Sequence, residues 1–334
     1  MNGRLASRRL AATEAPAHAA PHTLAEDVRA GLSRSGQKKL PPRWLYDDVG
    51  SALFEAICLM PEYGLARADS RILELHAGSM GRLAGHPGFV AELGSGSGRK
   101  SRLLLEDLAR HRPLTYIPID VSRAALTQCE AETASIPNLS VDPYEGEYLR
   151  GLSYAAAARR PGQRLLVLFL GSTIGNFDPP EAEQFLADVR RLLAAGDMLL
   201  LGTDLMKPVP DLLAAYDDPA GITAAFDLNL LARLNRELGA SFDLSCFSHE
   251  ARWNGEEGRI EMHLRSREAQ AIDIPGARLK VRLCKGETLW TESSYKFSPD
   301  QPHQLARRTG FRVVDTWTDP EWPFCETLLR ATLR

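Results

Sequence analysis

Residues 89–100 constrain the fold more than any other stretch of this chain, because they join a short apolar run, a glycine-rich segment and a helical pattern. The apolar run leads into Gly94, Gly96 and Gly98, and apolar residues then recur at helical spacing over 100–110. This order predicts a strand, a tight turn and a helix. Glycines allow positive φ and a close approach to a ligand, and the free N–H groups at a helix start favour an anionic or polar group. The stretch therefore predicts a nucleotide-binding turn.

The residues around this turn distinguish between kinds of nucleotide. The dinucleotide pattern G-x-G-x-x-G, started at Gly94, requires a glycine where the chain has Arg99. Glu92 lies two residues before the first glycine, and the next predicted strand, 114–120, ends in Asp120, an acid placed to bind ribose hydroxyls. The pattern E-x-G-x-G-x-G followed by this acid resembles the cofactor site of S-adenosylmethionine-dependent methyltransferases. A structural turn that binds no ligand is the alternative.

The composition argues against several classes of partner. Among 334 residues, 40 basic and 43 acidic side chains nearly balance, which argues against nucleic acid or a membrane surface. The five cysteines form no C-x-x-C pair and the eight histidines no H-E-x-x-H, so we expect no disulfide framework, no metal site and a cytoplasmic location. Residues 1–20 are rich in alanine and arginine without a long apolar run, so we expect a disordered leader, with an organelle presequence as the alternative.

Helical and strand-like patterns alternate over residues 68–204, which predicts a doubly wound α/β sheet. The most apolar run, 164–170, has the composition of a central parallel strand and ends in the turn Gly171-Ser-Thr-Ile-Gly-Asn, at the edge where such sheets bind ligands. The alternation then stops. The remaining predicted elements are a helical stretch at 211–238, strands at 247–253, 259–266 and 278–283, a helix at 301–309 and strands at 311–317 and 327–333.

Nine separate motifs, in order along the chain, extend the resemblance from a cofactor class to a family. They are Leu40-Pro-Pro-Arg-Trp-Leu-Tyr-Asp, Pro61-Glu-Tyr, Glu92-Leu-Gly-Ser-Gly, Phe169-Leu-Gly-Ser-Thr-Ile-Gly-Asn, Leu200-Leu-Gly-Thr-Asp-Leu, Ala215-Tyr-Asp-Asp, Asn235-Arg-Glu-Leu, Arg259-Ile-Glu-Met and Thr291-Glu-Ser-Ser-Tyr-Lys-Phe. From about Leu24 to the C-terminus, the chain resembles the histidine-specific Nα-methyltransferases of ergothioneine biosynthesis. The resemblance implies that S-adenosylmethionine donates three methyl groups to the α-amine of L-histidine, giving hercynine.

The resemblance also implies a fold and a domain organisation. We expect a Rossmann-like class I methyltransferase sheet over residues 70–205 plus 296–334. A second, α+β substrate-binding domain would be formed by an N-terminal segment and a large insertion, residues 21–69 plus 206–295. We expect a monomer that binds a small-molecule substrate.

The motifs carry the family's site residues to positions in this chain. Asn176 and Tyr216 correspond to groups that hold the amino acid's carboxylate, and Glu292 and Ser294 to a pair that hydrogen-bonds the imidazole. The other substrate residues are Tyr63 on the imidazole side, Gly171 and Thr173 near the amine, and Tyr46 as the catalytic group beside the reacting amine. The cofactor residues are Gly94, Gly96, Lys100, Asp120, Glu147 and Tyr148.

The expected chemistry consists mainly of positioning. Methyl transfer from a sulfonium needs an amine lone pair aligned behind the methyl group. The α-amine of a free amino acid is largely protonated at neutral pH, so the site must favour the neutral amine and let a proton leave. The phenol of Tyr46, with the turn from Gly171 to Thr173, is our candidate for orienting the amine and relaying that proton.

The chain departs from the family pattern at two places. Glu147-Tyr occupies the third-strand position where the family often has Asp-Phe, so the adenine contact is expected to be similar in kind. Gly64-Leu-Ala follows Pro61-Glu-Tyr, where close members carry a second tyrosine and then Pro-Thr. The second departure concerns the shape of one wall of the pocket.

Ordinary structural roles are the alternatives for the single residues. Asn176 alone is compatible with a helix cap, and Tyr216 with a half-buried aromatic of the insertion. Glu292 and Ser294 alternate along a strand and are compatible with a solvated face. Lys100 and Asp120 are compatible with a surface ion pair.

Three other functions remain open for the whole chain. The nearest is a methyltransferase for another aromatic amino acid or amine, and Glu292 with Ser294 argues against an indole, which offers one donor only. The second is a catalytically silent nucleotide-binding module. The third is a nicotinamide-dependent oxidoreductase, which Arg99 disfavours.

Overall fold

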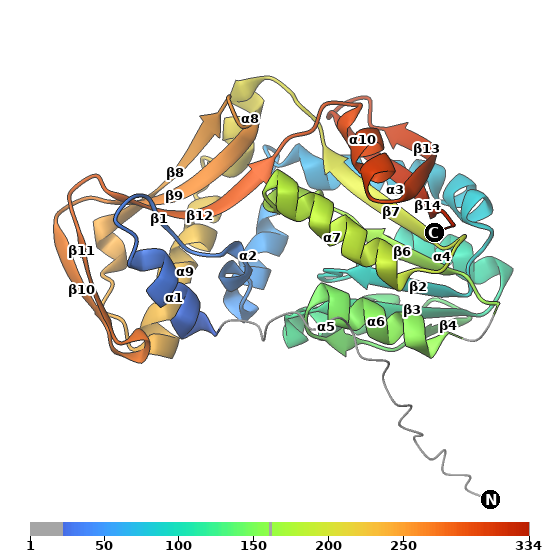
Figure 1. Ribbon diagram of the computed structural model, residues 1–334, viewed down its shortest axis with the longest axis horizontal. Helices are drawn as coiled ribbons and strands as arrows, with labels where there is room; N and C mark the ends of the chain where they lie inside the picture. Colours follow the sequence, from blue (N-terminus) through green and yellow to red (C-terminus); the bar gives the residue numbers. More distant parts are fainter. Residues whose placement is uncertain (1–22, 160–161, 334) are drawn as a thin grey trace, which may run out of the picture.

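The computed structural model describes residues 23–159 and 162–333, and these form two lobes that are each built on a sheet of their own (Figure 1). We call them the large-sheet lobe and the small-sheet lobe. The predicted leader, residues 1–20, lies outside the described residues. Within the described residues, no helix has the length and apolar character needed to cross a membrane.

The large-sheet lobe contains an eight-stranded sheet with the order β13-β14-β7-β6-β2-β3-β4, in which β5 also pairs with β3. Its strands are β2 (Phe89–Leu93), β3 (Leu114–Asp120), β4 (Leu139–Val141), β5 (Tyr144–Glu145), β6 (Leu165–Phe169), β7 (Met198–Asp204), β13 (Phe311–Thr318) and β14 (Phe324–Ala331). The strands from β2 to β7 pair in parallel, whereas β14 runs antiparallel to both β7 and β13. The predicted Rossmann-like methyltransferase sheet with its terminal hairpin is confirmed.

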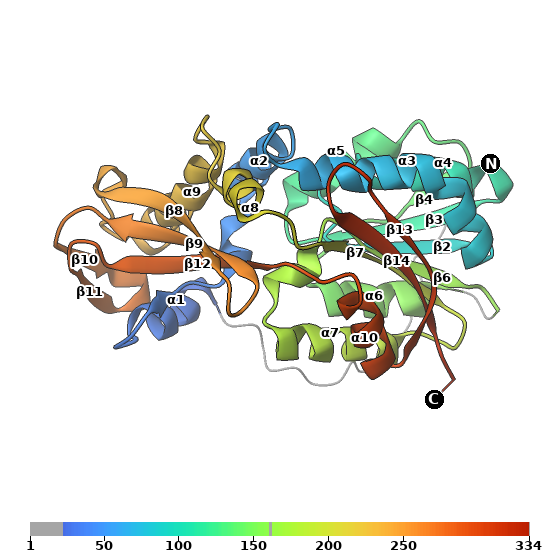
Figure 2. The same ribbon diagram turned by 90° about the horizontal axis from the view of Figure 1, so that it is seen from above.

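Helices cover both faces of this sheet, as Figure 2 shows for α3 and α4 on one side and α7 and α10 on the other. The first face carries α3 (Gly64–Ala84), α4 (Ser101–His111) and α5 (Arg123–Thr133), and the second carries α6 (Tyr148–Ala158), α7 (Pro179–Leu192) and α10 (Gln301–Arg308). Every residue of β2 and β6 is buried, because a parallel sheet covered on both faces has no solvated side.

The topology places a crevice beside β2. From β2 the chain proceeds outward to β3 and β4, and it then returns to β6 on the opposite side of β2. Open α/β sheets bind ligands at such a reversal of strand order, outside the carboxyl ends of the strands. Both predicted turns, at Gly94 and Gly171, leave strands at this edge.

The small-sheet lobe combines segments that are far apart in the sequence. Its four-stranded sheet has the order β1-β12-β9-β8, and β1 from the N-terminal segment pairs in parallel with β12, Lys38 opposite Leu289. The strands are β1 (Lys38–Lys39), β8 (Phe247–Asn254), β9 (Arg259–Ser266) and β12 (Thr288–Tyr295), with a separate hairpin of β10 (Gln270–Ile274) and β11 (Leu279–Leu283). The helices are α1 (Leu24–Leu32), α2 (Asp48–Ile57), α8 (Val209–Tyr216) and α9 (Ile222–Leu238), and a 3-10 turn, η1 (Pro42–Leu45), precedes α2.

Several predicted elements need correction. The helical stretch at 211–238 is two helices, because Asp218-Pro-Ala-Gly221 interrupts it and Gly221 has positive φ. Helix α6 and strand β10 were not predicted: α6 lacks a clear apolar period, and β10 is a strand of only five residues. Strand β14 begins at Phe324 rather than at residue 327, and α3 begins at Gly64 rather than at residue 68.

Candidate active site

A cavity of about 1530 Å³ extends from the carboxyl edge of the large sheet to β12 of the small sheet. Its lining includes all but one of the residues predicted from the sequence. On the cofactor side these are Gly94, Gly96, Asp120, Glu147 and Tyr148, and on the substrate side Tyr46, Tyr63, Gly171, Thr173, Asn176, Tyr216, Glu292 and Ser294. The two predicted half-sites therefore form one continuous space.

The glycine turn after β2 brings its backbone close to other groups of the site. Gly94 has φ 74° and Gly96 has φ 52°, conformations that residues with a Cβ rarely adopt. A Cβ at position 94 would lie 3.2 Å from the hydroxyl of Tyr148. The N–H of Gly96 donates to Asp120 Oδ2 at 3.0 Å, and the N–H of Ser122 donates to Asp120 Oδ1 at 2.9 Å. These bonds hold the Asp120 carboxylate at the end of β3, where its remaining lone pairs fit the hydroxyls of a nucleoside.

Two residues of the glycine motif serve packing instead. A Cβ at Gly98 would meet the Cys129 sulfur at 2.5 Å, so this glycine lets the turn pack against α5. Glu92 is buried in β2 and accepts a hydrogen bond from the hydroxyl of Tyr116. Neither residue lines the cavity. Gly98 and Glu92 of the motif therefore stabilise the turn through packing and do not face the cavity.

Lys100 is the predicted cofactor residue that does not line the cavity. Its ammonium donates to Asp69 Oδ2 at 2.7 Å, and the N–H of Gly171 donates to the same oxygen at 3.0 Å. Lys100 therefore connects α4 to the turn after β6 through Asp69, and its direct contact with the cofactor stays a prediction. The alternative of a Lys100–Asp120 surface pair is wrong, because Asp69 is the partner.

On the substrate side, five predicted residues meet in two hydrogen-bonded groups. Glu292 Oε1 accepts from the Asn176 side-chain amide at 3.3 Å and from the Tyr46 hydroxyl at 3.4 Å. The hydroxyls of Tyr216 and Ser294 lie 2.7 Å apart. Glu292 and Ser294 are only 6% and 5% exposed, which rules out a solvated strand face. Asn176 points to Glu292, so it does not serve merely as a cap of the next helix.

Burial changes the acidity of this group. Burial raises the pKa of Glu292 to about 8, and the neighbouring carboxylate of Asp227 adds to the rise, while Lys296 and Tyr46 oppose it. Burial also raises the pKa of the Tyr46 hydroxyl well above its ordinary value. Around neutral pH, Tyr46 is therefore a phenol that donates, and Glu292 can hold a proton.

A β-bulge turns Glu292 into the cavity. Along a regular strand, residues i and i+2 face the same side. In β12, however, Trp290 pairs with His263 and Glu292 with the next residue of β9, Met262, so Thr291 is an extra residue. Met262 lines the cavity with Glu292, while Trp290 stacks on His263 with ring centroids 5.9 Å apart. The bulge thus places Trp290 and Glu292 on opposite faces.

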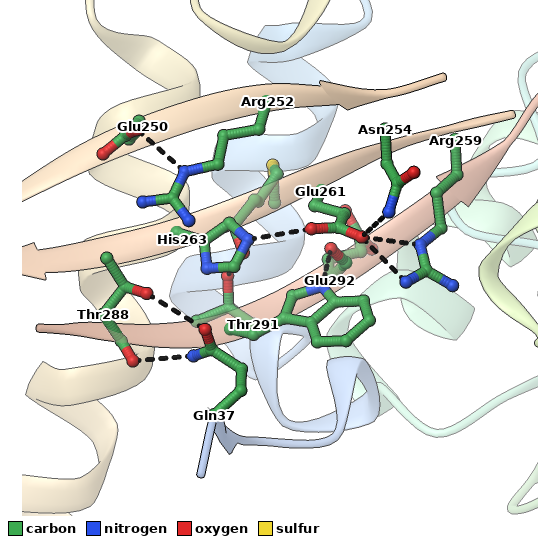
Figure 3. A network of polar contacts seen from close by, with 12 residues as sticks. Gln37, Glu250, Arg252, Asn254, Arg259, Glu261, His263, Thr288, Thr291 and Glu292 are labelled. Carbon is green, nitrogen blue, oxygen red and sulfur yellow. Dashed lines mark hydrogen bonds and ion pairs between the residues drawn. The ribbon is translucent and has the colours of Figure 1, made fainter. Parts of the chain in front are cut away.

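The side of the sheet away from the cavity holds this bulge with polar contacts. The indole N–H of Trp290 donates to the backbone carbonyl of Glu292 at 2.9 Å. On the same side, Glu261 accepts from Arg259 at 2.8 Å and from Asn254 at 3.0 Å, and it pairs with His263 at 3.2 Å (Figure 3). The Trp290 ring also packs against two cations, with Lys39 Nζ 4.5 Å and Arg259 Cζ 4.6 Å from its centroid, and its indole N–H holds the bulge.

Sequence reasoning missed several residues of the site. The apolar wall includes Phe54, Phe226 and Met262, whose types carry no catalytic signal. Lys296 was missed although it lies in Thr291-Glu-Ser-Ser-Tyr-Lys-Phe, two residues after Ser294. Its ammonium lies 2.8 Å from both the Tyr216 oxygen and Ser294 Oγ. Strand alternation was the available signal, since Lys296 follows Glu292 and Ser294 at even spacing.

The departure at Gly64 has a packing explanation. A Cβ at position 64 would lie 2.2 Å from Cε3 of Trp322. The indole of Trp322 thus occupies the space that a tyrosine at position 64 would need. Tyr63 is unaffected, since it lines the cavity and its ring packs edge-on against Tyr216 at 5.9 Å.

Comparisons with known proteins agree with this geometry. Residues 24–331 match the model of a family described as histidine-specific, S-adenosylmethionine-dependent methyltransferases. The chain is 43% identical to "Histidine N-alpha-methyltransferase" of Mycolicibacterium smegmatis over 92% of this chain and 95% of that protein. It is 40% identical to the protein of the same name from Mycobacterium tuberculosis, over 90% and 92%.

A fungal relative is also similar. "Ergothioneine biosynthesis protein 1" of Neurospora crassa is 30% identical over 85% of this chain, which corresponds to 32% of that longer protein. The family match spans both lobes, from α1 to the last residue of β14. The chain therefore belongs to the family of histidine-specific, S-adenosylmethionine-dependent methyltransferases.

Proposed function

We propose that this protein transfers three methyl groups from S-adenosylmethionine to the α-amino nitrogen of L-histidine, forming hercynine in the first step of ergothioneine biosynthesis. One observation carries the proposal: Glu292 and Ser294 share a single cavity with Asn176, Tyr216 and the glycine turn. The names of the mycobacterial and fungal relatives support the same substrate and pathway.

The cofactor half of the cavity fits the donor. Gly94 and Gly96 leave the backbone open to a ligand, and Asp120 offers carboxylate oxygens for the ribose hydroxyls. Tyr148 and Glu147 line the same half and are proposed to hold the adenine. The bound donor supplies a methyl group on a positively charged sulfur.

The substrate half positions the amino acid. Asn176 and the Tyr216 hydroxyl are proposed to bind the carboxylate, and Glu292 with Ser294 the two ring nitrogens. A substrate without such a ring would leave these buried groups unpaired, and sites of this kind reject such a substrate by roughly 10⁴-fold or more. Tyr63 packs on Tyr216 and is proposed to close the imidazole side.

The amine must lose protons before and during the three transfers. Tyr46 donates to Glu292 and stays a phenol, so its role is to orient the amine and pass a proton on, not to act as a phenolate base. The turn from Gly171 to Thr173 lines the same part of the cavity and is proposed to assist. General acid–base assistance of this kind typically contributes about 10²-fold or more.

Mass spectrometry of histidine incubated with the enzyme and S-adenosylmethionine tests the proposal. We expect three successive additions of one methyl group each. Tryptophan and phenylalanine serve as competing substrates, and preferential methylation of either would overturn the assignment to histidine. Calorimetric titration with S-adenosylmethionine and then histidine separates an enzyme from a silent binding module, because binding without any transfer would point to the module.

We further propose a monomer in the cytoplasm. A reducing compartment is supported by Cys58, Cys129, Cys246, Cys284 and Cys325, which are all free. The monomer is supported by the cavity, since residues of one chain supply both halves. Light scattering of the purified protein measures its mass in solution, and a dimer would refute this part.

A further inference from the structure

Lys296 is a buried lysine whose three N–H donors all have partners in the structure. Its side chain is fully enclosed, and its ammonium lies 3.0 Å from Asp204 Oδ2. It also donates to the Tyr216 hydroxyl oxygen and to Ser294 Oγ, both at 2.8 Å. Burial lowers the pKa of Lys296, but Tyr216 and Asp204 more than offset this, so the group stays charged. An ammonium can only donate, so both hydroxyl oxygens must accept from it.

These contacts restrict what the two hydroxyls can offer a ligand. Tyr216 and Ser294 lie 2.7 Å apart, so one O–H donates to the other oxygen and only one O–H remains free. If Ser294 donates to Tyr216, the Tyr216 oxygen accepts twice and its own O–H points outward. Ser294 then has one acceptor site left. If the direction reverses, the roles exchange. In either arrangement the pair offers one donor and one acceptor, on different residues.

We propose that Lys296 is a positioning residue that fixes this arrangement and makes Ser294 a hydrogen-bond acceptor toward the substrate ring. The inference rests on the proposed function, in which Tyr216 binds a carboxylate. A carboxylate only accepts, so Tyr216 must donate its free O–H to it. Ser294 must then donate to Tyr216, and it can only accept from the ligand. The ring nitrogen that faces Ser294 must therefore carry a hydrogen.

This requirement also determines the proton count of the site. With an N–H directed at Ser294, a neutral imidazole presents a bare nitrogen on its other side, where Glu292 must donate. Tyr46 and Asn176 both donate to Oε1 of Glu292, which leaves Oε2 to carry that proton. A charged imidazolium facing an ionised Glu292 has the same number of protons. Lys296 thus selects a ring with an N–H at one nitrogen and a second nitrogen that shares a proton with Glu292.

Replacing Lys296 by methionine tests the proposal, with Lys207→Met as the matched control. Lys207 is the other buried lysine on Asp204, at 2.5 Å from Oδ1, and it contacts neither Tyr216 nor Ser294. We expect Lys296→Met to raise KM for histidine by about tenfold to hundredfold, while the Kd for S-adenosylmethionine stays unchanged. Lys207→Met should lower the melting temperature without changing KM for histidine. Equal KM changes in both variants would overturn the proposal.

A second substrate gives a readout that a loss of stability alone would not change. Thiazolylalanine has a ring nitrogen that accepts but no ring N–H. The wild-type enzyme should discriminate strongly against it, and Lys296→Met should reduce this discrimination because Ser294 and Tyr216 can then move apart and donate separately. A discrimination equal to that of the wild type would overturn the proposal.

Two further measurements keep the proposal testable. If Lys296→Met does not fold, Ser294→Ala serves instead, since it removes the acceptor and should lower the same ratio. If the wild-type enzyme methylates thiazolylalanine and histidine with equal efficiency, the role of Lys296 is refuted, while histidine methylation remains supported. A wild-type enzyme that methylates neither would refute the proposed function itself.

Discussion

The two halves of the cavity are built in different ways. The cofactor half is formed at the ends of neighbouring parallel strands, where Gly94 and Gly96 follow β2 and Asp120 ends β3. The substrate half is formed by side chains from Tyr46, Asn176, Tyr216 and β12, which come from distant parts of the chain. The cofactor half therefore depends on the local conformation of neighbouring strand ends, whereas the substrate half depends on how distant segments of the chain come together in the fold. We therefore expect some substitutions to change the binding of S-adenosylmethionine and others to change the use of histidine.

The largest separation is expected from Glu292→Ala. The change removes the acceptor for Asn176 and Tyr46 and leaves both donors buried without it. We expect kcat/KM for histidine to fall by roughly 10⁴-fold. The Kd for S-adenosylmethionine, measured by calorimetry, should not change. A variant that still methylates histidine in preference to phenylalanine or tryptophan would show that Glu292 does not select the ring.

Tyr46→Phe tests the proposed proton relay within the substrate half. The ring contacts with Phe54 and Phe226, at 5.6 and 5.4 Å, are kept, and only the hydroxyl is lost. We expect at least one methylation step to slow by about 10²-fold, with little change in KM. Single-turnover kinetics that follow the mono-, di- and trimethylated products separate the steps. Unchanged rates for all three would remove Tyr46 from the mechanism.

Gly94→Ala addresses the cofactor half. At φ 74° an alanine is strained by about 1–2 kcal/mol, and its Cβ would approach the Tyr148 hydroxyl. We expect the affinity for S-adenosylmethionine to fall about tenfold. Gly196→Ala is the control, because Gly196 has φ 90° with no atom within 4 Å of the added Cβ, so it introduces strain away from the cavity. Equal affinities for both variants would argue against a close approach of ligand at Gly94.

The last prediction concerns a pH dependence of stability that Glu292 gives to the substrate half. Burial raises the pKa of Glu292 from 4.5 to about 8, so between these values the folded protein keeps a proton that the unfolded chain loses. The stability from this group is complete at low pH and falls as pH rises, by at most about 1.4 kcal/mol per pH unit. Glu292→Gln cannot ionise, so its unfolding free energy relative to the wild type should increase with pH. A constant difference in urea titrations would mean that Glu292 ionises normally.

Much of the large sheet could be predicted from the sequence because its signals are local. Apolar runs, glycine turns and helical spacing follow one another from β2 to β7, and a parallel sheet needs little more to specify it. Helix α6 was missed because Gly151, which packs on Ile119, and several alanines carry its inner face without a strong apolar period. The boundaries of the two domains, 70–205 plus 296–334 and 21–69 plus 206–295, stay a prediction.

The candidate site was predictable in its residue types and less so in its connections. Family motifs pointed to Glu292, Ser294 and Tyr216, but no local pattern shows that Lys296 contacts Asp204, which ends a strand of the other sheet. The ion pair of Lys100 was missed for the same reason, since its partner Asp69 lies in α3. Long-range ion pairs have no periodic signal in a sequence, so neither partner could be predicted, and the direct contact of Lys100 with the cofactor stays a prediction.

The extra residue in β12 has a consequence for how such a pocket can change. Before Thr291, residues with even numbers such as Trp290 face away from the cavity, and after Thr291, even-numbered residues such as Glu292 face into it. Deleting Thr291 would restore the regular alternation of the strand and turn the glutamate carboxyl group away from the cavity. A substitution cannot change the direction of a side chain in this way. In β12, the insertion or deletion of one residue therefore changes which side chains face the cavity, whereas a substitution changes one side chain only.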